Sequence, residues 1–319
     1  MIRNIIFIFF AALLVSCNNK SKLEKEIEQI PVEFELIRFD QKFASVTPET
    51  LPALKAEYPF LFPQRFHDSI WVQRINDTIQ HELNREVEKE FPDFSSEEDQ
   101  LQSLFQHLKY YFPSFEAPTV ITVTSEVDYK NKVLLADDYL FISLDTYLGK
   151  NHEFYLGIQT YLKKNFERNQ ILPDVAAEYA KKYIPQPESK TFLAHMLYYG
   201  KILYLKDILL PQTPDAVKIG YTAEEYTWAV ENEEQIWKYF VERQVLFNSD
   251  TELYSRFLYP APFSKFYLEL DNESPAMLGQ YIGWEIIRQY MSREKVSIRE
   301  MLVTDAETIF NKANYKPRK

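Results

Sequence analysis

The alternation of apolar and polar residues predicts a small β-sheet in the first half of the chain. Residues 32–39 alternate apolar and polar positions, which is typical of a half-buried strand. Residues 118–124 are dense in β-branched side chains and predict a buried strand, and residues 139–144 predict another. Residues 132–135 are a further candidate strand. The predicted sheet therefore lies before Gly157.

Apolar residues at steps of three and four predict helices before and after these strands. Thr47-Pro48 has the cap and first-turn residues of a helix that runs to about residue 58. Residues 68–89 predict one amphipathic helix, and a capping box within residues 95–98 predicts the start of a helix that continues to residue 112. Later helices are predicted at residues 155–167, 173–182, 190–209, 222–247 and 275–292. We expect a mainly helical α+β fold, with a small sheet in the N-terminal half packed by a helical majority.

An apolar run over residues 5–15 ends just before Cys17, the single cysteine of the chain. The run has the length of a signal-peptide core, and as a helix it would rise only about 16 Å, half of a bilayer's hydrocarbon thickness. Leu14-Val15-Ser16-Cys17 resembles a bacterial lipobox, in which the thiol receives a diacylglycerol and the cysteine becomes the new N-terminus. Ordinary secretion with cleavage elsewhere is the alternative, and it leaves the position of Cys17 unexplained.

The lipobox divides the chain into three parts. We predict a lipoprotein signal peptide over residues 1–16, a lipid anchor and tether over residues 17–31, and a single globular domain over residues 32–319. Lipidation of Cys17 also excludes disulfides, since no second thiol exists.

The composition narrows the classes of partner. The net charge is −11, and removal of the signal peptide takes away one further cation, Arg3. An acidic body disfavours nucleic acid and anionic lipid headgroups as direct partners. The acyl chains would therefore hold the protein on a membrane. Only six glycines argue against a glycine-rich phosphate loop, and we expect no cofactor and no small-molecule substrate.

The histidines do not form a recognisable metal motif. The chain has five of them, His67, His81, His107, His152 and His195. No two lie four residues apart, so the zinc motif H-E-x-x-H is absent, and Arg85 stands where a second ligand after His81-Glu82 would be. A zinc site would need ligands gathered from scattered elements. His195 lies among apolar residues and is predicted to be a hydrogen-bonded core residue.

Two other groups of residues allow a functional interpretation. Asp174 and Glu178 are four residues apart at the start of a helix, where they would bind a divalent cation, act as an acid/base pair or, more simply, favour the helix dipole. Gly279 and Gly283 lie on one side of a helix beside Trp284, which favours tight helix packing over a ligand groove. No residue has the local signature of a nucleophile.

Several segments together resemble the gliding-motility lipoprotein GldB family. Besides the lipobox, the resemblance rests on Phe34-Glu35-Leu36-Ile37-Arg38-Phe39-Asp40 and Tyr139-Leu140-Phe141-Ile142-Ser143-Leu144-Asp145-Thr146-Tyr147-Leu148-Gly149. It continues in Leu197-Tyr198-Tyr199-Gly200-Lys201 and Gly279-Gln280-Tyr281-Ile282-Gly283-Trp284-Glu285-Ile286-Ile287. The likeness covers essentially the whole chain in the expected order.

The GldB family is similar in turn to predicted zinc peptidases with a zincin-like core. In those enzymes one helix carries H-E-x-x-H, and a later helix carries Glu before Gly. Here the first helix offers Asp174 and Glu178 without histidine, and Tyr199 precedes Gly200. The resemblance therefore implies a zincin-like core without the metal motif, with these three residues as a degenerate site.

The resemblance also implies a role. We expect a non-catalytic lipoprotein of the cell envelope that is required for gliding motility and the associated protein-secretion machinery. Its partners would be the membrane, through the N-terminal lipid, and other proteins of that machinery. Its body would face the periplasm, with the membrane leaflet left open. The alternatives are a metal-dependent hydrolase or peptidase with a non-standard site, and a protein that binds a small ligand in a groove beside Trp284.

Overall fold

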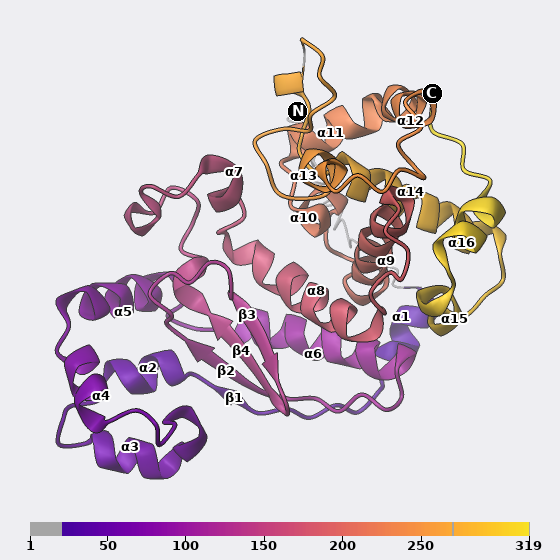
Figure 1. The fold of residues 1–319 in the computed structure, drawn as a ribbon. Coiled ribbons are helices and arrows are strands. Elements are labelled where there is room, and N and C mark those ends of the chain that lie inside the picture. The colour runs from indigo at the N-terminus through magenta and orange to yellow at the C-terminus, as the bar shows by residue number, and fades with distance from the viewer. Residues whose placement is uncertain (1–20, 270, 319) are drawn as a thin grey trace, which may run out of the picture.

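The computed structural model describes residues 21–269 and 271–318, so the predicted signal peptide and Cys17 lie outside the described residues. The sheet and the helices around it form one side of the molecule, and the C-terminal helices form the other (Figure 1). Helices α8 (Ile171–Tyr183) and α9 (Phe192–Leu209) join the two sides, since α8 contacts strand β3, α6 and α9. The mainly helical α+β fold that the sequence predicts is confirmed.

The sheet has four strands in the order β1-β2-β4-β3. Strand β1 (Leu36–Ile37) pairs in parallel with β2 (Thr119–Val123), which pairs in parallel with β4 (Tyr139–Ser143), and β3 (Val133–Ala136) closes the edge in antiparallel orientation. The strands predicted at 118–124, 132–135 and 139–144 are all present. The strand predicted at residues 32–39 is only two residues long, because helix α2 (Phe39–Ala44) begins directly after it.

Of the helices of the N-terminal half, the one predicted from residue 95 to residue 112 is confirmed, whereas the earlier ones have other bounds. The helices are α3 (Leu51–Glu57), α4 (Asp68–Ile75), α5 (Thr78–Glu90) and α6 (Ser95–Tyr111). The single helix predicted at residues 68–89 is wrong, because the Asp77 carboxylate accepts hydrogen bonds from the N–H groups of Ile79 and Gln80 and starts a new helix. The capping box predicted within residues 95–98 is also wrong, since Ser95 is already helical and its N–H is bonded to Asp93.

Helices dominate the C-terminal half. Besides α8 and α9 they are α7 (Thr160–Lys163), α10 (Asp215–Ile219), α11 (Ala223–Glu231), α12 (Glu233–Glu242), α13 (Glu252–Phe257), α14 (Leu278–Arg293), α15 (Ile298–Val303) and α16 (Ala306–Ala313). Short 3-10 turns lie at Pro59–Leu61, Leu144–Thr146, Glu153–Tyr155, Arg168–Gln170 and Asp271–Glu273. Of the helix predicted at 155–167 only the four residues of α7 are α-helical. The helix predicted at 222–247 is interrupted at Asn232, which separates α11 from α12.

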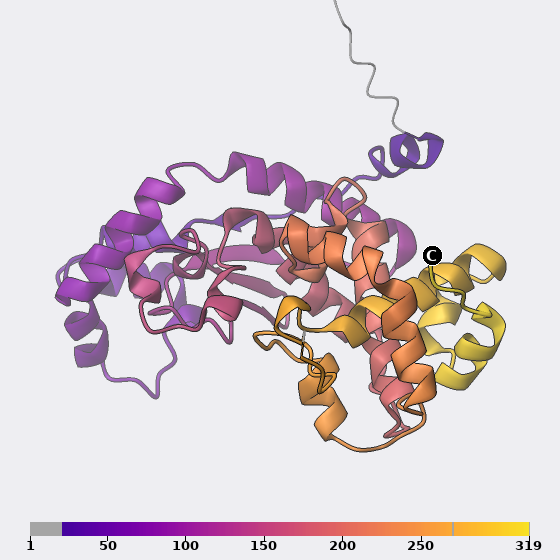
Figure 2. The ribbon, with the colours of Figure 1, turned by 90° about the horizontal axis from the view of Figure 1, so that it is seen from above.

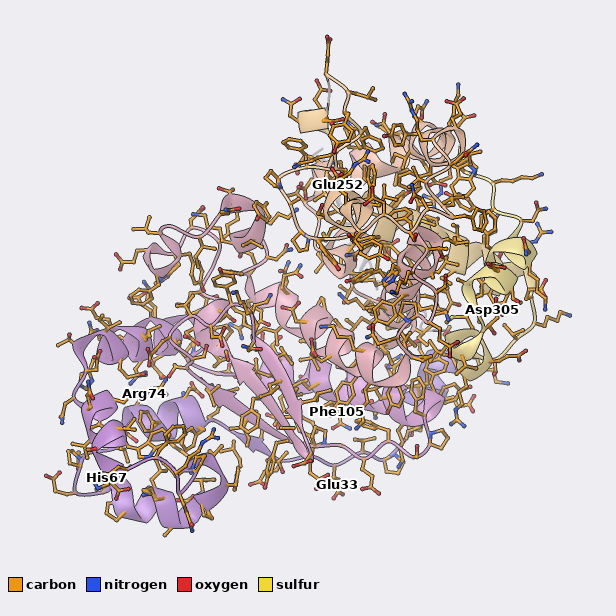
Figure 3. The ribbon with its side chains drawn as sticks, viewed as in Figure 1. Glu33, His67, Arg74, Phe105, Glu252 and Asp305 are labelled. Atoms are coloured by element: carbon orange, nitrogen blue, oxygen red, sulfur yellow. The ribbon has the colours of Figure 1, made fainter. Side chains whose placement is uncertain are left out.

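The larger of two clusters of buried apolar side chains runs through both halves, and the smaller one lies among α2, α3 and α4. Phe105 of α6 is fully buried at the side of the sheet and meets Phe34 edge-on, with 5.1 Å between ring centroids (Figure 3). In the C-terminal half, α9 and α14 cross at close range, with Trp284 and Tyr281 fully buried beside the crossing. No helix within residues 21–269 and 271–318 combines the length and the hydropathy that a membrane span needs.

The described part of the predicted tether is docked on the body. It forms α1 (Lys22–Ile27), whose Ile27 is fully buried. The amide of Gln106 on α6 donates hydrogen bonds to the carbonyls of Glu28 and Ile30, and His107 pairs with Glu24 at 3.2 Å. Figure 2 shows α1 at the end of α6. From Lys22 onward the segment is therefore not a free spacer.

Candidate functional site

A pocket of about 220 Å³ lies where the sheet side of the molecule meets the C-terminal helices. Its charged lining consists of four lysines and one carboxylate, Lys132, Lys164, Lys206, Lys218 and Asp174, and we call it the lysine pocket. The rest of the lining is Tyr129, Tyr161, Leu162, Asn165, Phe166, Gln170, Ile219, Gly220, Pro260, Ala261, Ala276 and Met277. These residues come from six separate segments, so packing alone assembles the pocket.

Three of the four lysines already have carboxylate partners. Lys132 bonds to Asp174 and lies over the ring of Tyr147. Lys164 pairs with Glu225 at 2.6 Å. Lys218 pairs with two carboxylates behind the pocket, at 2.9 and 3.2 Å. These pairs neutralise most of the positive charge.

Lys206 differs from the other three. Only 9% of it is exposed, and its ammonium donates one hydrogen bond, of 2.8 Å, to the carbonyl oxygen of Lys218. Among the described residues it has no carboxylate within ion-pair distance. Burial lowers the pKa of Lys206 to about 8, and the more distant charge of Asp174 opposes this shift. Lys206 is thus a cation that remains largely protonated at neutral pH.

Arg288 of α14 organises the ion network behind the pocket. Its guanidinium bonds to Asp207 through two nitrogens at 2.8 Å, to Asp215 at 2.9 Å and to Glu285 at 2.8 Å. It also lies over the ring of Trp284, 3.7 Å from the centroid. Burial raises the pKa of the Glu285 carboxyl, and the charge of Arg288 opposes this. The network fixes α9, α10 and α14 relative to one another, and with them Lys206 and Lys218.

Of the three residues of the predicted degenerate site, Asp174 and Glu178 lie one turn apart on α8, whereas Tyr199 lies on α9. Asp174 lies in the lysine pocket, where it accepts hydrogen bonds from Lys132 and, at 2.9 Å, from the hydroxyl of Tyr147. Glu178 pairs with Lys181 at 2.5 Å. Tyr199 lies in another environment, against Tyr198, and burial raises its pKa to about 12.

A metal centre needs several converging ligands. Residues 21–269 and 271–318 contain no cluster of three or more histidine, cysteine, aspartate or glutamate side chains that would hold an ion. Asp174, the member of the predicted site that lines a pocket, faces lysine ammonium groups there. The arrangement suits electrostatic pairing rather than metal coordination.

The alternative of a ligand groove beside Gly279, Gly283 and Trp284 is wrong, because these residues are packed in the core. A Cβ on Gly283 would lie 2.1 Å from the carbonyl oxygen of Met196, and one on Gly279 would lie 2.8 Å from two side chains. Trp284 has no exposed surface. Gly283 serves the close crossing of α9 and α14, and Gly279 lets Leu258, Phe192 and Phe257 pack against α14, so tight helix packing, the competing interpretation, is what the structure has.

The histidines are dispersed. His67 lies at the outer corner of the N-terminal helices and caps α4 (Figure 3). His152 pairs with Glu86 at 3.2 Å. His195 is half-buried against the ring of Tyr254, with 4.4 Å between centroids, and burial lowers its pKa. Because His195 is only partly buried and its described side-chain contact is this ring, the prediction of a hydrogen-bonded core position is wrong.

The lysines of the pocket were not among the site residues that the sequence predicted. One signal was available: Lys201 and Lys206 stand in an otherwise apolar helix, where a lysine is seldom placed without a partner. The sequence does not reveal which residues lie opposite them.

A wider groove of about 760 Å³ lies between α4, α5 and the loop of residues 125–127. Glu126 and Val127 in this loop both have positive φ, which is strained for residues other than glycine. The fully buried carboxylate of Asp145 accepts hydrogen bonds from the N–H groups of Ser125 and Val127 and so holds the loop. The buried Asp145 carboxylate therefore holds one wall of this groove in place.

The fold and the site together define a mainly helical α+β protein with a lysine-lined pocket between its sheet side and its C-terminal helices. The chain belongs to the family described as gliding motility protein GldB, whose model matches residues 20–317. The protein is therefore related to gliding motility, and the name of the family model marks its members as lipoproteins. No curated protein and no solved structure matches the chain, so the zincin-like core stays a prediction.

Proposed function

We propose that the protein is a lipid-anchored, non-catalytic component of the envelope machinery for gliding motility and the associated protein secretion. The observation that carries the proposal is the lipobox at Cys17 in a chain whose remaining length matches the GldB family. The protein would act through contacts with other proteins of that machinery, with its body in the periplasm.

The surroundings of Asp174 support a non-catalytic role. Metal-assisted hydrolysis needs ligands that hold the ion and a base that activates its water. The Asp174 carboxylate is instead bonded to Lys132 and Tyr147, and both burial and Asp174 raise the pKa of that tyrosine. A cation entering the site would meet the ammonium groups of Lys132 and Lys206. This environment disfavours a metal ion.

The docking of α1 limits where the lipid would hold the body. From Cys17 to Ser21 the chain spans at most about 14 Å, at roughly 3.6 Å per residue. Because α1 is fixed on α6 through Ile27 and the hydrogen bonds of Gln106, the α1 end of the molecule would lie close to the membrane surface. Partner proteins would then reach the faces that point away from it.

The substitution Cys17→Ser tests the anchor, with Ser16→Ala as the matched control. Serine cannot form the thioether, whereas alanine is a small residue that a lipobox accepts before its cysteine. We expect Cys17→Ser to abolish radiolabelled palmitate incorporation, leave an unprocessed precursor and abolish gliding and secretion, and Ser16→Ala to behave as wild type. Gliding and secretion at wild-type levels by an unlabelled Cys17→Ser protein would refute the lipid-anchored role.

Metal analysis of the detergent-purified full chain tests the alternative of a metal-dependent hydrolase. We expect zinc well below one ion per chain in the wild-type protein. We also expect no change of metal content in Asp174→Asn or Glu178→Gln. Stoichiometric zinc that disappears in either variant together with a peptidase activity would overturn the non-catalytic role. Cross-linking in cells, followed by identification of the linked proteins, would name the partners.

A further inference from the structure

We infer that the lysine pocket is a binding site for the oxyanion of a small ligand, a carboxylate or a phosphate, which pairs with Lys206. The proposed role of the protein assigns no ligand to this pocket. The inference goes beyond that role and does not depend on the lipid anchor.

Lysines dominate the charged lining of the pocket. The residues that face the cavity include four lysines and a single carboxylate, Asp174, in a protein whose overall charge is −11. Asp207, Asp215 and Glu225, which pair with two of these lysines, do not line the cavity. An anion inside would therefore meet Lys206, which has no carboxylate partner among the described residues, and the low-dielectric surroundings would strengthen that attraction.

The ammonium group of Lys206 has only one of its hydrogen bonds satisfied in the described structure. A lysine ammonium has three N–H donors, and the described structure gives this one a single acceptor, the carbonyl oxygen of Lys218. A buried ammonium without a carboxylate partner is energetically unfavourable. Since Lys206 lines the cavity, an oxyanion there could accept its remaining hydrogen bonds. The pocket thus contains a buried cation whose carboxylate partner is missing among the described residues.

Helix α14 begins at the lysine pocket. Met277, with φ of +59°, ends the preceding segment and starts this 16-residue helix, and Ala276 and Met277 both line the pocket. The N-terminus of a helix carries a partial positive charge. It therefore adds to the charge of the lysines.

The size and the apolar wall of the pocket limit the ligand. A volume of about 220 Å³ admits an oxyanion with a short organic group, and Phe166, Ile219 and Met277 supply buried apolar surface for that group. Asn165 and Gln170 each donate an amide N–H to a backbone carbonyl, of Gly220 and Val217 respectively, which holds both side chains in place at the pocket. A short-chain carboxylate uses both surfaces, whereas inorganic phosphate uses the charged one alone.

Calorimetric titration of the detergent-purified full chain tests this inference. Two probes are used, inorganic phosphate and butyrate, each at constant ionic strength with chloride as the non-binding salt. We expect saturable binding of at least one probe to one site per chain. Binding of phosphate alone or of butyrate alone supports the inference and identifies which oxyanion the pocket prefers.

The variants Lys206→Met and Lys201→Met separate the pocket from general effects of a buried lysine. Both lysines belong to α9, both are about nine-tenths buried, and both ammonium groups bond to backbone carbonyls, but Lys201 does not line the lysine pocket. We expect Lys206→Met to weaken binding of the probe at least tenfold and Lys201→Met to leave it unchanged. Equal affinity in wild type and Lys206→Met would overturn the inference.

A measurement on the wild-type protein keeps the test valid if Lys206→Met does not fold. The rate of acetylation of each lysine by acetic anhydride is read by mass spectrometry, with and without the probe. We expect the probe to protect Lys206 at least fivefold and to leave Lys201 unaffected. Absence of saturable binding together with an unchanged rate at Lys206 would refute the site.

Discussion

The crossing of α9 and α14 allows a sharp stability prediction for Gly283→Ala. A Cβ at this position would lie 2.1 Å from the carbonyl oxygen and 2.8 Å from the carbonyl carbon of Met196. Ordinary contact begins at 3.4 Å, so the two helices would have to move apart by about 1.3 Å. The obstacle is backbone, which cannot rotate away as a side chain would. The crossing must therefore open.

The magnitude follows from two opposing effects. Alanine favours a helix by about 1 kcal/mol over glycine. Overpacking of a dense core typically costs 1–3 kcal/mol and occasionally more. Since Trp284 and Tyr281 are fully buried beside the crossing, separation of the helices would disturb their packing too. Because the overlap is with backbone, we take the overpacking cost at about 3 kcal/mol, the top of its range, so Gly283→Ala should lower the free energy of unfolding by a net of about 2 kcal/mol.

Urea unfolding followed by circular dichroism measures this difference as a lower midpoint at an unchanged m-value. Gly200→Ala completes a double-mutant cycle, because a Cβ there would lie 2.4 Å from the carbonyl carbon and oxygen of Gly283. Once one alanine has opened the crossing, the second should cost less than it does alone. A Gly283→Ala protein as stable as wild type, or more stable, would refute the close crossing.

Three further substitutions test the buried charges. Arg288→Met should lower the free energy of unfolding by about 3 kcal/mol at neutral pH, since it leaves buried carboxylates unpaired. The loss should shrink in acid, where Glu285, whose pKa burial raises, becomes protonated; a deficit independent of pH in denaturant titrations would contradict this. Burial lowers the pKa of Lys206 to about 8 from 10.5, so the folded state binds fewer protons than the unfolded state between these values and stability rises with pH there. Lys206→Met should therefore stabilise the protein by roughly 3 kcal/mol at pH 7 and by much less at pH 10.5, and an equal difference at both pH values would disprove the explanation. Asp145→Asn should cost about 2 kcal/mol and speed hydrogen exchange in the loop of residues 125–127, which its carboxylate holds; unchanged exchange would count against that role.

The helices and strands that the sequence predicted correctly are those with a strong local pattern. Strands β2 and β4 are dense in β-branched and aromatic residues, and α8, α9 and α14 are long and periodic. The errors lie at helix breaks. At Asn76-Asp77 and at Asn232 the apolar period continues across the break, so periodicity joined two helices that the capping groups separate.

The predicted site shows a different limit. The absence of H-E-x-x-H followed directly from the spacing of the histidines. The position of Asp174 did not, because its partners Lys132 and Tyr147 lie 42 and 27 residues away along the chain. Local sequence describes the chemistry of a side chain, but it does not describe the charges that packing places opposite it.

The sequence by itself determined the predicted attachment to a membrane through Cys17, the fold class and the family, because each depends on residues that are neighbours along the chain. The tertiary structure alone decided that Gly200 and Gly283 face each other and that four distant lysines line one pocket. Burial and pairing energies depend on distances between side chains from separate elements, and only the packed structure fixes those distances.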